Sequence, residues 1–225
     1  MLEANKSAIF EKVFAIYNRN LLKRRFHSLQ VSGLEFLLNR NNNFPLVIYS
    51  NHSSWWDGLI AFQISFKMRL NSFIMMEEKQ LKNLSHFRKL GAFSVVREKP
   101  REAIHSIRYA AKILNSDPTS TLWIFPQGEI LPNDRRPLFF YNGLSKIIKQ
   151  TEKCETTSLS IRYEFLGEFK PQIFVKIEKP VTNSESEKSD ARQLSEMLSE
   201  RLTGNLDSLI NDVINQKFEG YESIL

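Results

Sequence analysis

The chain has very little cysteine and no long run of apolar residues. One cysteine in 225 residues, Cys154, excludes an internal disulfide framework and a cysteine-based zinc site. No stretch approaches the roughly eighteen consecutive apolar residues of a membrane span, and the opening MLEANKSAIF lacks the basic start and apolar run of a secretory signal. These absences predict a cytoplasmic protein that is soluble or peripheral to a membrane.

The composition is that of a folded domain with an excess of basic residues. Hydrophobic residues make up 42% of the chain and aromatic residues 12%, enough for one well-buried α/β core plus an appendage. The formal charge of +6 favours an anionic partner, although a basic surface without a special partner fits equally well. Neither an aromatic-basic motif nor a helix-turn-helix pattern is present, so no nucleic-acid partner is expected.

An amphipathic helix is predicted over residues 6–22, followed by a basic cluster at 23–25. An apolar stripe that ends in cations is typical of a helix lying in a membrane interface. A helix docked on the protein's own core, with solvated cations at its C-terminus, explains the pattern equally well. The apolar residues of the stripe are Ile9, Phe10, Val13, Phe14, Tyr17, Leu21 and Leu22.

Strands and helices alternate through the middle of the chain, which predicts an α/β fold. The expected sheet is mostly parallel, has one antiparallel edge and is flanked by helices, including an N-terminal amphipathic helix and a C-terminal helix. Strands are predicted over 44–49, 72–76, 92–96 and 121–125, and helices over 54–68, 79–90, 101–115 and 138–150.

The remaining segments complete the expected organisation. Residues 158–165 and 172–179 alternate at period two and are expected to pair as a hairpin. A polar linker at 183–190 precedes a final helix that is expected to pack on the sheet. We expect three parts: the N-terminal helix at 1–27, an α/β domain at 28–182, and the linker and final helix of the same domain at 183–225.

A histidine and an aspartate stand five residues apart in the stretch YSNHSSWWDGLIA. On one continuous helix this spacing places the side chains on different faces. They meet if His52 lies in the turn after a strand and Asp57 in the first turn of the next helix, which Ser53 or Ser54 can cap. The carboxylate then orients the imidazole and stabilises its protonated form, as in a general base with an orienting group.

Two further loops follow predicted strands in the same way. Arg97 comes directly after the strand at 92–96, and the segment PQGEILPNDRRP follows the strand at 121–125. Segments that leave the carboxyl ends of parallel strands emerge at one edge of the sheet, where ligands bind in open α/β folds. The sequence therefore predicts a site at that edge with a base, an arginine and a glycine-containing loop.

Several blocks, in this order, resemble those of the glycerolipid acyltransferases, the superfamily that includes 1-acylglycerol-3-phosphate acyltransferases. NHSSWWD matches the Asn-His-x-x-x-x-Asp motif, and GAFSVVR is similar to the Gly-x-x-x-Val-x-Arg block. FPQGEI stands where the superfamily has Phe-Pro-Glu-Gly-Thr-Arg, and FFYNGLSKII resembles the Phe-x-x-Gly segment that opens a helix. The resemblance covers roughly residues 28–180.

The resemblance implies acyl transfer from a thioester, acyl-CoA or acyl carrier protein, to a hydroxyl of a lysophosphatidate, lysophospholipid or glycolipid on the cytoplasmic face of an anionic membrane. His52 would take the hydroxyl proton and Asp57 would hold the imidazole. No covalent acyl-enzyme is needed, in keeping with the absence of a Gly-x-Ser-x-Gly elbow. No cofactor and no metal are expected. The implied substrate-binding residues are Asn51, Arg97, Phe125, Pro126, Gln127, Gly128, Glu129, Arg135 and Arg136.

Backbone N–H groups near the helix start after His52 are expected to meet the oxyanion. The tryptophans that follow, Trp55 and Trp56, fit an apolar path or the membrane interface as well as they fit core packing.

Two positions of the third block depart from the superfamily pattern, and Ser158 stands where the fourth block usually has a proline. Where its third block has a glutamate and an arginine for the glycerol and phosphate of the acceptor, this chain has Gln127 and Ile130. Gln127 keeps hydrogen bonding without charge, while Ile130 cannot bind phosphate. Either Arg97, Arg135 or Arg136 binds the phosphate instead, or the acceptor carries none and is a glycolipid or another hydroxylated lipid.

Two other functions fit the same fold. A non-catalytic lipid-binding protein explains the altered third block, but the intact His52, Asp57 and Arg97 argue against it. A thioester hydrolase uses water in place of the acceptor, and the dependence of thiol release on the headgroup distinguishes it from a transferase. The histidines lack a metal-ligand pattern such as His-Glu-x-x-His, and Cys154 has no histidine nearby in sequence, as expected of a bystander thiol.

Overall fold

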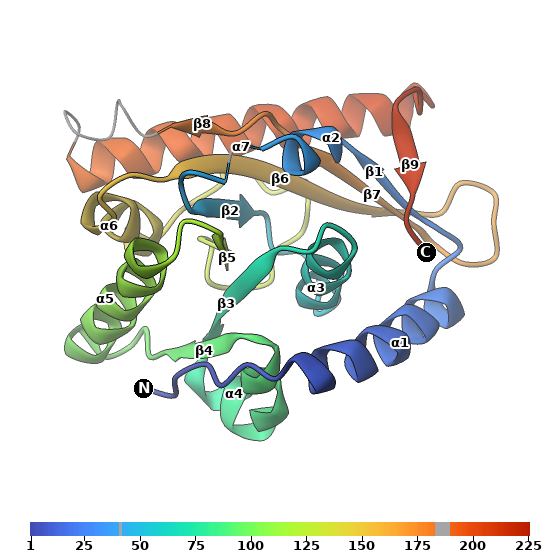
Figure 1. The fold of residues 1–225 in the computed structure, drawn as a ribbon. Helices are drawn as coiled ribbons and strands as arrows, with labels where there is room; N and C mark the ends of the chain where they lie inside the picture. Colours follow the sequence, from blue (N-terminus) through green and yellow to red (C-terminus); the bar gives the residue numbers. More distant parts are fainter. Residues whose placement is uncertain (41, 183–189) are drawn as a thin grey trace.

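The computed structural model describes residues 1–40, 42–182 and 190–225 and has one central sheet between layers of helices (Figure 1). No helix within these ranges is long and apolar enough to cross a membrane. The elements in chain order are α1 (Ala8–Arg25), β1 (Leu29–Ser32), α2 (Glu35–Leu38), β2 (Leu46–Ser50), α3 (Asp57–Lys67), β3 (Asn71–Glu77), α4 (Glu78–Asn83), the 3-10 helix η1 (Ser85–Leu90), β4 (Ala92–Val95), α5 (Pro100–Ser116), β5 (Ser120–Ile124), α6 (Gly143–Gln150), β6 (Glu155–Glu164), β7 (Gln172–Ile177), β8 (Val181–Thr182), α7 (Ala191–Ile214) and β9 (Tyr221–Ser223).

The sheet is mixed, with its parallel part on one side. Its spatial order is β4-β3-β5-β2-β6-β7-β1-β9, and β8 pairs with the start of β6. β4, β3, β5, β2 and β6 run parallel to one another. β7 is antiparallel to β6, β1 is parallel to β7, and β9 is antiparallel to β1. The predicted α/β sheet flanked by helices is confirmed.

Alternation along the strands gives the sheet an apolar surface on each face. In β2, Leu46 and Ile48 enter a core shared with α1, α2 and α3. Val47 and Tyr49 point the other way, into a core shared with α5, α6 and α7. All four side chains are fully buried, as expected for a central strand covered on both faces. The C-terminal helix packs on the sheet as predicted.

The inner face of α1 is docked on α3. Phe14 and Leu22 are buried, and the buried Asn18 amide donates hydrogen bonds to the carbonyl of Leu59 at 3.1 Å and to Gln63 Oε1 at 3.2 Å. A buried amide that loses these partners costs about 1–3 kcal/mol, so the pair fixes the position of the helix. Docking explains only the inner face, because the outer apolar side chains of α1 stay exposed.

The predicted antiparallel edge is wrong in one respect, because β7 is not at the edge of the sheet. β6 and β7 form the predicted hairpin, with Leu159 opposite Ile177 and Glu164 opposite Gln172. β1 then lies beside β7, and β9 covers β1. These two strands have four and three residues, too few for alternation to distinguish a strand from a loop.

Helix boundaries also differ from the predictions. α6 begins at Gly143 rather than at 138, because Leu138 and Phe140 are both buried, a spacing of two that belongs to extended backbone. The predicted helix at 79–90 divides at Leu84 into α4 and the 3-10 helix η1. The predicted linker at 183–190 lies, except for Asp190, outside the described residues.

Candidate active site

Three loops at the carboxyl ends of parallel strands meet at one edge of the sheet. His52 follows β2, Arg97 follows β4 and Gly128 follows β5. The loops that contain Arg97 and Gly128 are in contact. They lie so close that a Cβ added at Gly128 would be 2.6 Å from Arg97 Nη1. Gly128 also has a φ of +70°, a conformation that glycine adopts without steric cost. The structure thus brings together the base, the arginine and the glycine-containing loop that the sequence predicts.

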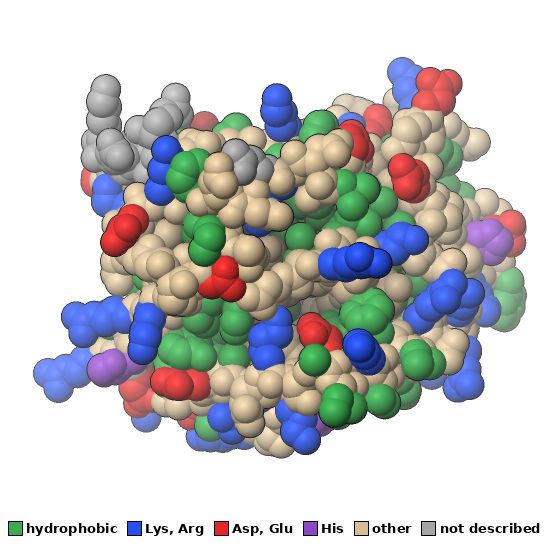
Figure 2. Space-filling model, in the orientation of Figure 1, with side chains coloured by type: hydrophobic (Ala, Val, Ile, Leu, Met, Phe, Trp, Pro, Cys, Tyr) green, Lys and Arg blue, Asp and Glu red, His purple; other side chains and the backbone are tan. Residues whose placement is uncertain are grey.

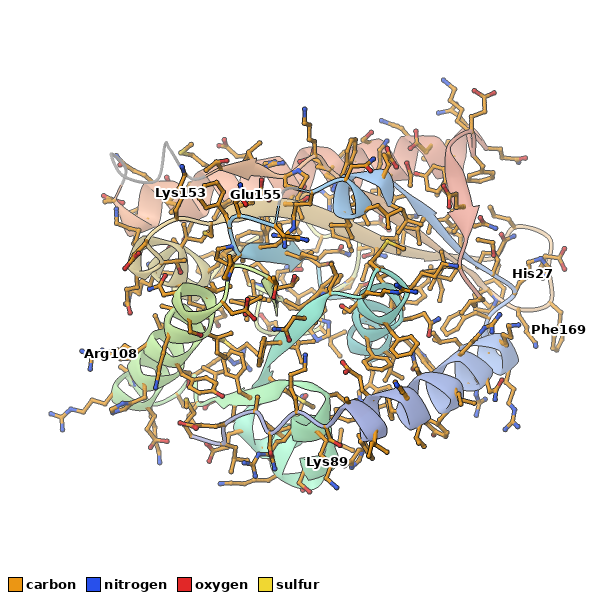
Figure 3. All side chains as sticks on the ribbon, viewed as in Figure 1. His27, Lys89, Arg108, Lys153, Glu155 and Phe169 are labelled. Carbon is orange, nitrogen blue, oxygen red and sulfur yellow. The ribbon has the colours of Figure 1, made fainter. Side chains whose placement is uncertain are left out.

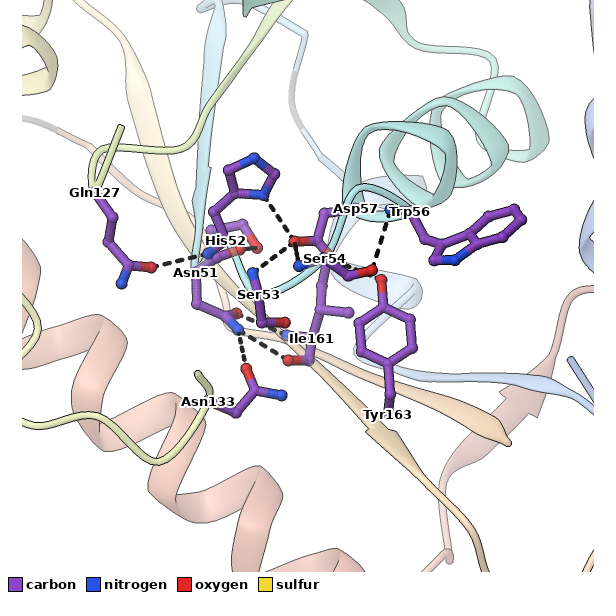
Figure 4. A network of polar contacts seen from close by, with 11 residues as sticks. Asn51, His52, Ser53, Ser54, Trp56, Asp57, Gln127, Asn133, Ile161 and Tyr163 are labelled. Carbon is purple, nitrogen blue, oxygen red and sulfur yellow. Dashed lines mark hydrogen bonds and ion pairs between the residues drawn. The ribbon is translucent and has the colours of Figure 1, made fainter. Parts of the chain in front are cut away.

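His52 and Asp57 face each other across the turn between β2 and α3 (Figure 4). His52 Nδ1 lies 2.8 Å from Asp57 Oδ2. The Asp57 side chain is completely buried, whereas that of His52 is 22% exposed. The imidazole stacks on Phe125, with ring centroids 4.5 Å apart and planes at 25°. The carboxylate and the aromatic ring together fix the orientation of the imidazole, so that Nε2 points away from Asp57.

The buried carboxylate of Asp57 accepts four hydrogen bonds. Oδ2 accepts the backbone N–H groups of Ser53 at 2.7 Å and Ser54 at 2.9 Å in addition to the His52 ring. The expected serine cap is displaced from the helix start: α3 begins at Asp57 with Trp56 at its N-cap, and Ser54 Oγ accepts the N–H of Trp56 in the preceding turn at 3.3 Å. The N–H groups of Ser53 and Ser54 are already bonded to Asp57, so donors near the helix start that meet an oxyanion must be other N–H groups.

Tyr163 on β6 supplies the fourth hydrogen bond and is absent from the predicted site. Its hydroxyl donates to Asp57 Oδ1 at 2.5 Å. Burial, followed by the negative charge of Asp57, raises the pKa of the Tyr163 hydroxyl well above its ordinary value. A signal was present in the sequence, since Tyr163 alternates with Leu159 and Ile161, which face the same core as α3. This hydrogen bond holds the carboxylate in the orientation in which it contacts His52.

Two cavities meet at His52. The first, called the apolar cavity, lies between α1, α3 and β3 and has walls of large hydrophobic side chains. The second, called the groove, is open, has a volume of about 730 Å³ and lies on the other side of His52, over β4, α5 and the start of α6. His52, Gln80, Phe125 and Ile130 line both. Trp55 lines the apolar cavity, whereas Trp56 packs edge-on against Phe26. The apolar walls include Phe14, Leu59, Phe62, Phe73, Phe87 and Trp123.

Arg97 lies on the wall of the groove. Its guanidinium carbon stands 5.9 Å from the centroid of the Tyr141 ring, and Nη2 is 3.9 Å from Glu77 Oε2. Three more predicted residues, Pro126, Gly128 and Glu129, line the same groove. The structure therefore collects the second and third predicted blocks around one groove, which His52 also lines.

Two predicted substrate-binding residues hold the backbone instead of lining a cavity. The buried Gln127 accepts the backbone N–H of His52 on Oε1 at 2.8 Å. The buried Asn51 donates to the carbonyl of Ile161 at 2.9 Å and to Asn133 Oδ1 at 2.8 Å, and it accepts the N–H of Ile161 at 2.8 Å. These contacts fix the His52 turn between β6 and the loop after β5 (Figure 4).

The two arginines of the loop after β5 lie away from the groove. Arg136 pairs with Asp207 on α7 and donates to the carbonyl of Asn133 at 2.7 Å. Neither Arg135 nor Arg136 lines the groove or the apolar cavity. In the described part of the chain, no three His, Cys, Asp or Glu side chains gather closely enough to bind a metal ion.

Comparison with known proteins agrees with this geometry. The family model described as Acyltransferase matches residues 28–163, more than half of the 225-residue chain. The crystal structure of the 1-acyl-sn-glycerophosphate acyltransferase PlsC from Thermotoga maritima has a similar fold, with a TM-score of 0.56 and 18% identity over 85% of this chain and 79% of that chain. Curated proteins gave no match. Because the family model covers more than half of the chain, including His52 and Asp57, the chain belongs to the Acyltransferase family, and its fold is similar to that of the glycerolipid acyltransferase PlsC.

Proposed function

We propose that this protein moves a fatty acyl group from an acyl thioester to a hydroxyl of a lipid, with His52 as the general base. The observation that carries the proposal is the 2.8 Å contact between His52 Nδ1 and the buried carboxylate of Asp57. The same histidine lines both the apolar cavity and the groove. An imidazole held this way keeps its proton on Nδ1 and has Nε2 free to accept another.

The reaction follows from that arrangement. Nε2 takes the proton of the acceptor hydroxyl as the oxygen attacks the thioester carbonyl, and Asp57 stabilises the imidazolium. The new ester C–O bond forms and the C–S bond breaks. The proton on Nε2 then passes to the departing thiolate. Phe125 shields one face of the ring, and Gln127 and Asn51 act through the backbone as positioning residues.

The apolar cavity fits the acyl chain and the groove fits the acceptor. A fatty acyl chain needs walls without hydrogen-bonding demands, and the apolar cavity has them next to His52. The groove carries Arg97, Glu129 and Lys146 in addition to apolar side chains, which suits a headgroup. The donor carrier, CoA or acyl carrier protein, leaves from the junction between the two.

We also propose an anionic membrane, on its cytoplasmic face, as the surface on which the protein works. Ile9, Val13, Ile16 and Tyr17 are 58–80% exposed on the outer face of α1. Figure 2 shows hydrophobic and basic side chains side by side over this helix. Phe169, which is 98% exposed, lies beside its C-terminal end (Figure 3). An apolar face bordered by cations is what an anionic bilayer surface attracts.

Thiol release tests the proposal. Purified protein is incubated with vesicles, a panel of lipid acceptors and palmitoyl-CoA or palmitoyl-acyl carrier protein, and free thiol and acylated product are measured. His52→Ala should lower the rate by about 10²–10⁴-fold, and His105→Ala, on the exposed side of α5, should leave it unchanged. Release without any acceptor would favour a hydrolase. Equal rates for wild type and His52→Ala would contradict the proposal.

A further inference from the structure

Carboxylates outnumber cations in the groove. Glu77, Glu98 and Glu129 line it, against Arg97 and Lys146. Glu98, Glu129 and Lys146 are exposed at its rim, while Arg97 and Glu77 are about one-third exposed. This balance is the reverse of what a site for a phosphate monoester requires, because that group carries about −1.5 to −2 charge near pH 7.

Neither cation is placed to bind a phosphate on its own. Arg97 stands between Glu77 and the ring of Tyr141, so part of its charge is already compensated. Lys146 is an exposed side chain, and a flexible ammonium there provides one mobile point charge. Ile130 stands at the junction of the two cavities. The arginines of the same loop are turned away, with Arg136 on Asp207.

We infer that the acceptor is an uncharged lipid alcohol, and that the groove discriminates against a phosphate monoester. This inference rests on the proposed acyl transfer and names its acceptor class. A phosphate in the groove would meet the like charge of the carboxylates that line it, which opposes its binding. The same carboxylates accept hydrogen bonds from hydroxyl groups, so they favour the neutral acceptor and oppose the charged one.

The remaining walls of the groove fit an alcohol with an apolar body. Met75, Val95, Ile107, Ile124 and Leu144 line it together with the partly exposed ring of Tyr141. Such side chains cover carbon, while the glutamates near the rim meet additional hydroxyl groups. A glycerol or sugar with a free hydroxyl on a hydrocarbon tail satisfies both kinds of surface.

The test compares two acceptors that differ only in the phosphate. 1-Monooleoylglycerol and 1-oleoyl-lysophosphatidate are presented in phosphatidylcholine vesicles at one ionic strength, with palmitoyl-CoA and, separately, palmitoyl-acyl carrier protein. A long-chain alkyl glucoside is a second uncharged acceptor. We expect kcat/KM for an uncharged acceptor to exceed that for lysophosphatidate by at least about tenfold. Equal use of lysophosphatidate, or preference for it, overturns the inference.

A charge added at the junction provides the second measurement. Ile130→Arg should raise the use of lysophosphatidate relative to monooleoylglycerol by at least about tenfold. Ile104→Arg adds the same charge on α5 outside the groove, and we expect it to leave the ratio unchanged. If Ile130→Arg leaves the use of lysophosphatidate relative to monooleoylglycerol unchanged, the inference that charge in the groove selects the acceptor is overturned. If no acceptor gives His52-dependent thiol release with either donor, the proposed function itself fails, and the inference fails with it.

Discussion

At the scale of single residues, Tyr163 ties the stability of the molecule to the buried carboxylate that contacts His52. The Tyr163 hydroxyl is a neutral donor in a buried site, and without it Asp57 Oδ1 would lose its partner. We expect Tyr163→Phe to lower the free energy of unfolding by about 1–3 kcal/mol near pH 7. Urea unfolding monitored by fluorescence measures this change.

The raised pKa of Tyr163 also predicts how stability depends on pH. The folded state keeps this hydroxyl protonated while the unfolded chain ionises it near pH 10. The contribution of Tyr163 is therefore complete below about pH 10 and is lost as the pH rises further, at up to about 1.4 kcal/mol per pH unit.

Unfolding curves at several pH values test whether the contribution of Tyr163 to stability falls as the pH rises. The wild type should lose stability above about pH 10 more steeply than Tyr163→Phe. Tyr17→Phe, on the exposed face of α1, controls for the loss of a tyrosine as such and should follow the wild type. Identical slopes for wild type and Tyr163→Phe would contradict the assignment.

Sequence reasoning at this scale identifies residue types better than their partners. His52 and Asp57 lie as predicted because a short turn after β2 leaves them few alternatives. The contacts of Gln127 and Asn51 could not be predicted in the same way, because both depend on how distant strands align. A polar residue in a motif looks like a ligand contact, whereas burial turned these two side chains toward the backbone.

At the scale of elements, α3 forms a wall of the apolar cavity and contains a glycine there. Gly58 lines the cavity, and a Cβ at this position would meet no atom within 4 Å. Gly58→Leu should narrow the cavity while slightly favouring the helix, by up to about 1 kcal/mol. If the acyl chain occupies this space, kcat/KM for palmitoyl relative to octanoyl donors should fall by at least about tenfold.

This prediction is tested by measuring kcat/KM against the chain length of the acyl donor for Gly58→Leu and for a control variant. Gly204→Leu, at an exposed position of α7 where a Cβ is also free of contacts, makes the same change far from the cavity. Its profile should match the wild type. An unchanged profile for Gly58→Leu would show that the acyl chain lies elsewhere.

The outer face of α1 carries the membrane prediction. Val13→Glu with Ile16→Glu replaces two exposed apolar side chains by charges that an anionic surface repels. Binding to phosphatidylserine-containing vesicles in a sedimentation assay should weaken by at least about tenfold, given that each buried apolar side chain contributes about 1.5–3 kcal/mol.

Matched substitutions on other helices make this prediction specific. Ile104→Glu with Ile214→Glu changes two exposed isoleucines on α5 and α7 and adds the same charge. We expect little effect on vesicle binding from this pair. Equal weakening by both pairs would assign the binding to net charge and not to α1.

The long periodic elements follow from the sequence, and the short ones do not. The helices α1, α5 and α7 and the ten-residue strand β6 each contain enough turns or alternations for the pattern to stand out, and β2 to β5 stand out as short, mostly apolar runs between helical segments. β1 and β9 are stabilised by their neighbours and not by their own pattern. Tertiary pairing therefore decides elements of this length, and a single sequence does not contain that information.

At the scale of the whole molecule, the two faces of the sheet supply different parts of the site. α1 and α3, on one face, enclose the apolar cavity, and α5 and α6, on the other, border the groove. The His52 turn lies at the edge between them, so one side chain reaches both spaces. The order of the blocks in the sequence predicts that edge, but the contrast between the two sides appears only once the helices are placed.

The contacts that hold the His52 turn span long stretches of the chain. Asn51 meets Ile161 across 110 residues, Tyr163 meets Asp57 across 106, and Gln127 meets His52 across 75. Ordering such distant segments is slow, because the entropy of closing a long loop is lost before the contacts form. Catalytic activity should therefore return only in the slowest step of refolding, together with the burial of Trp123.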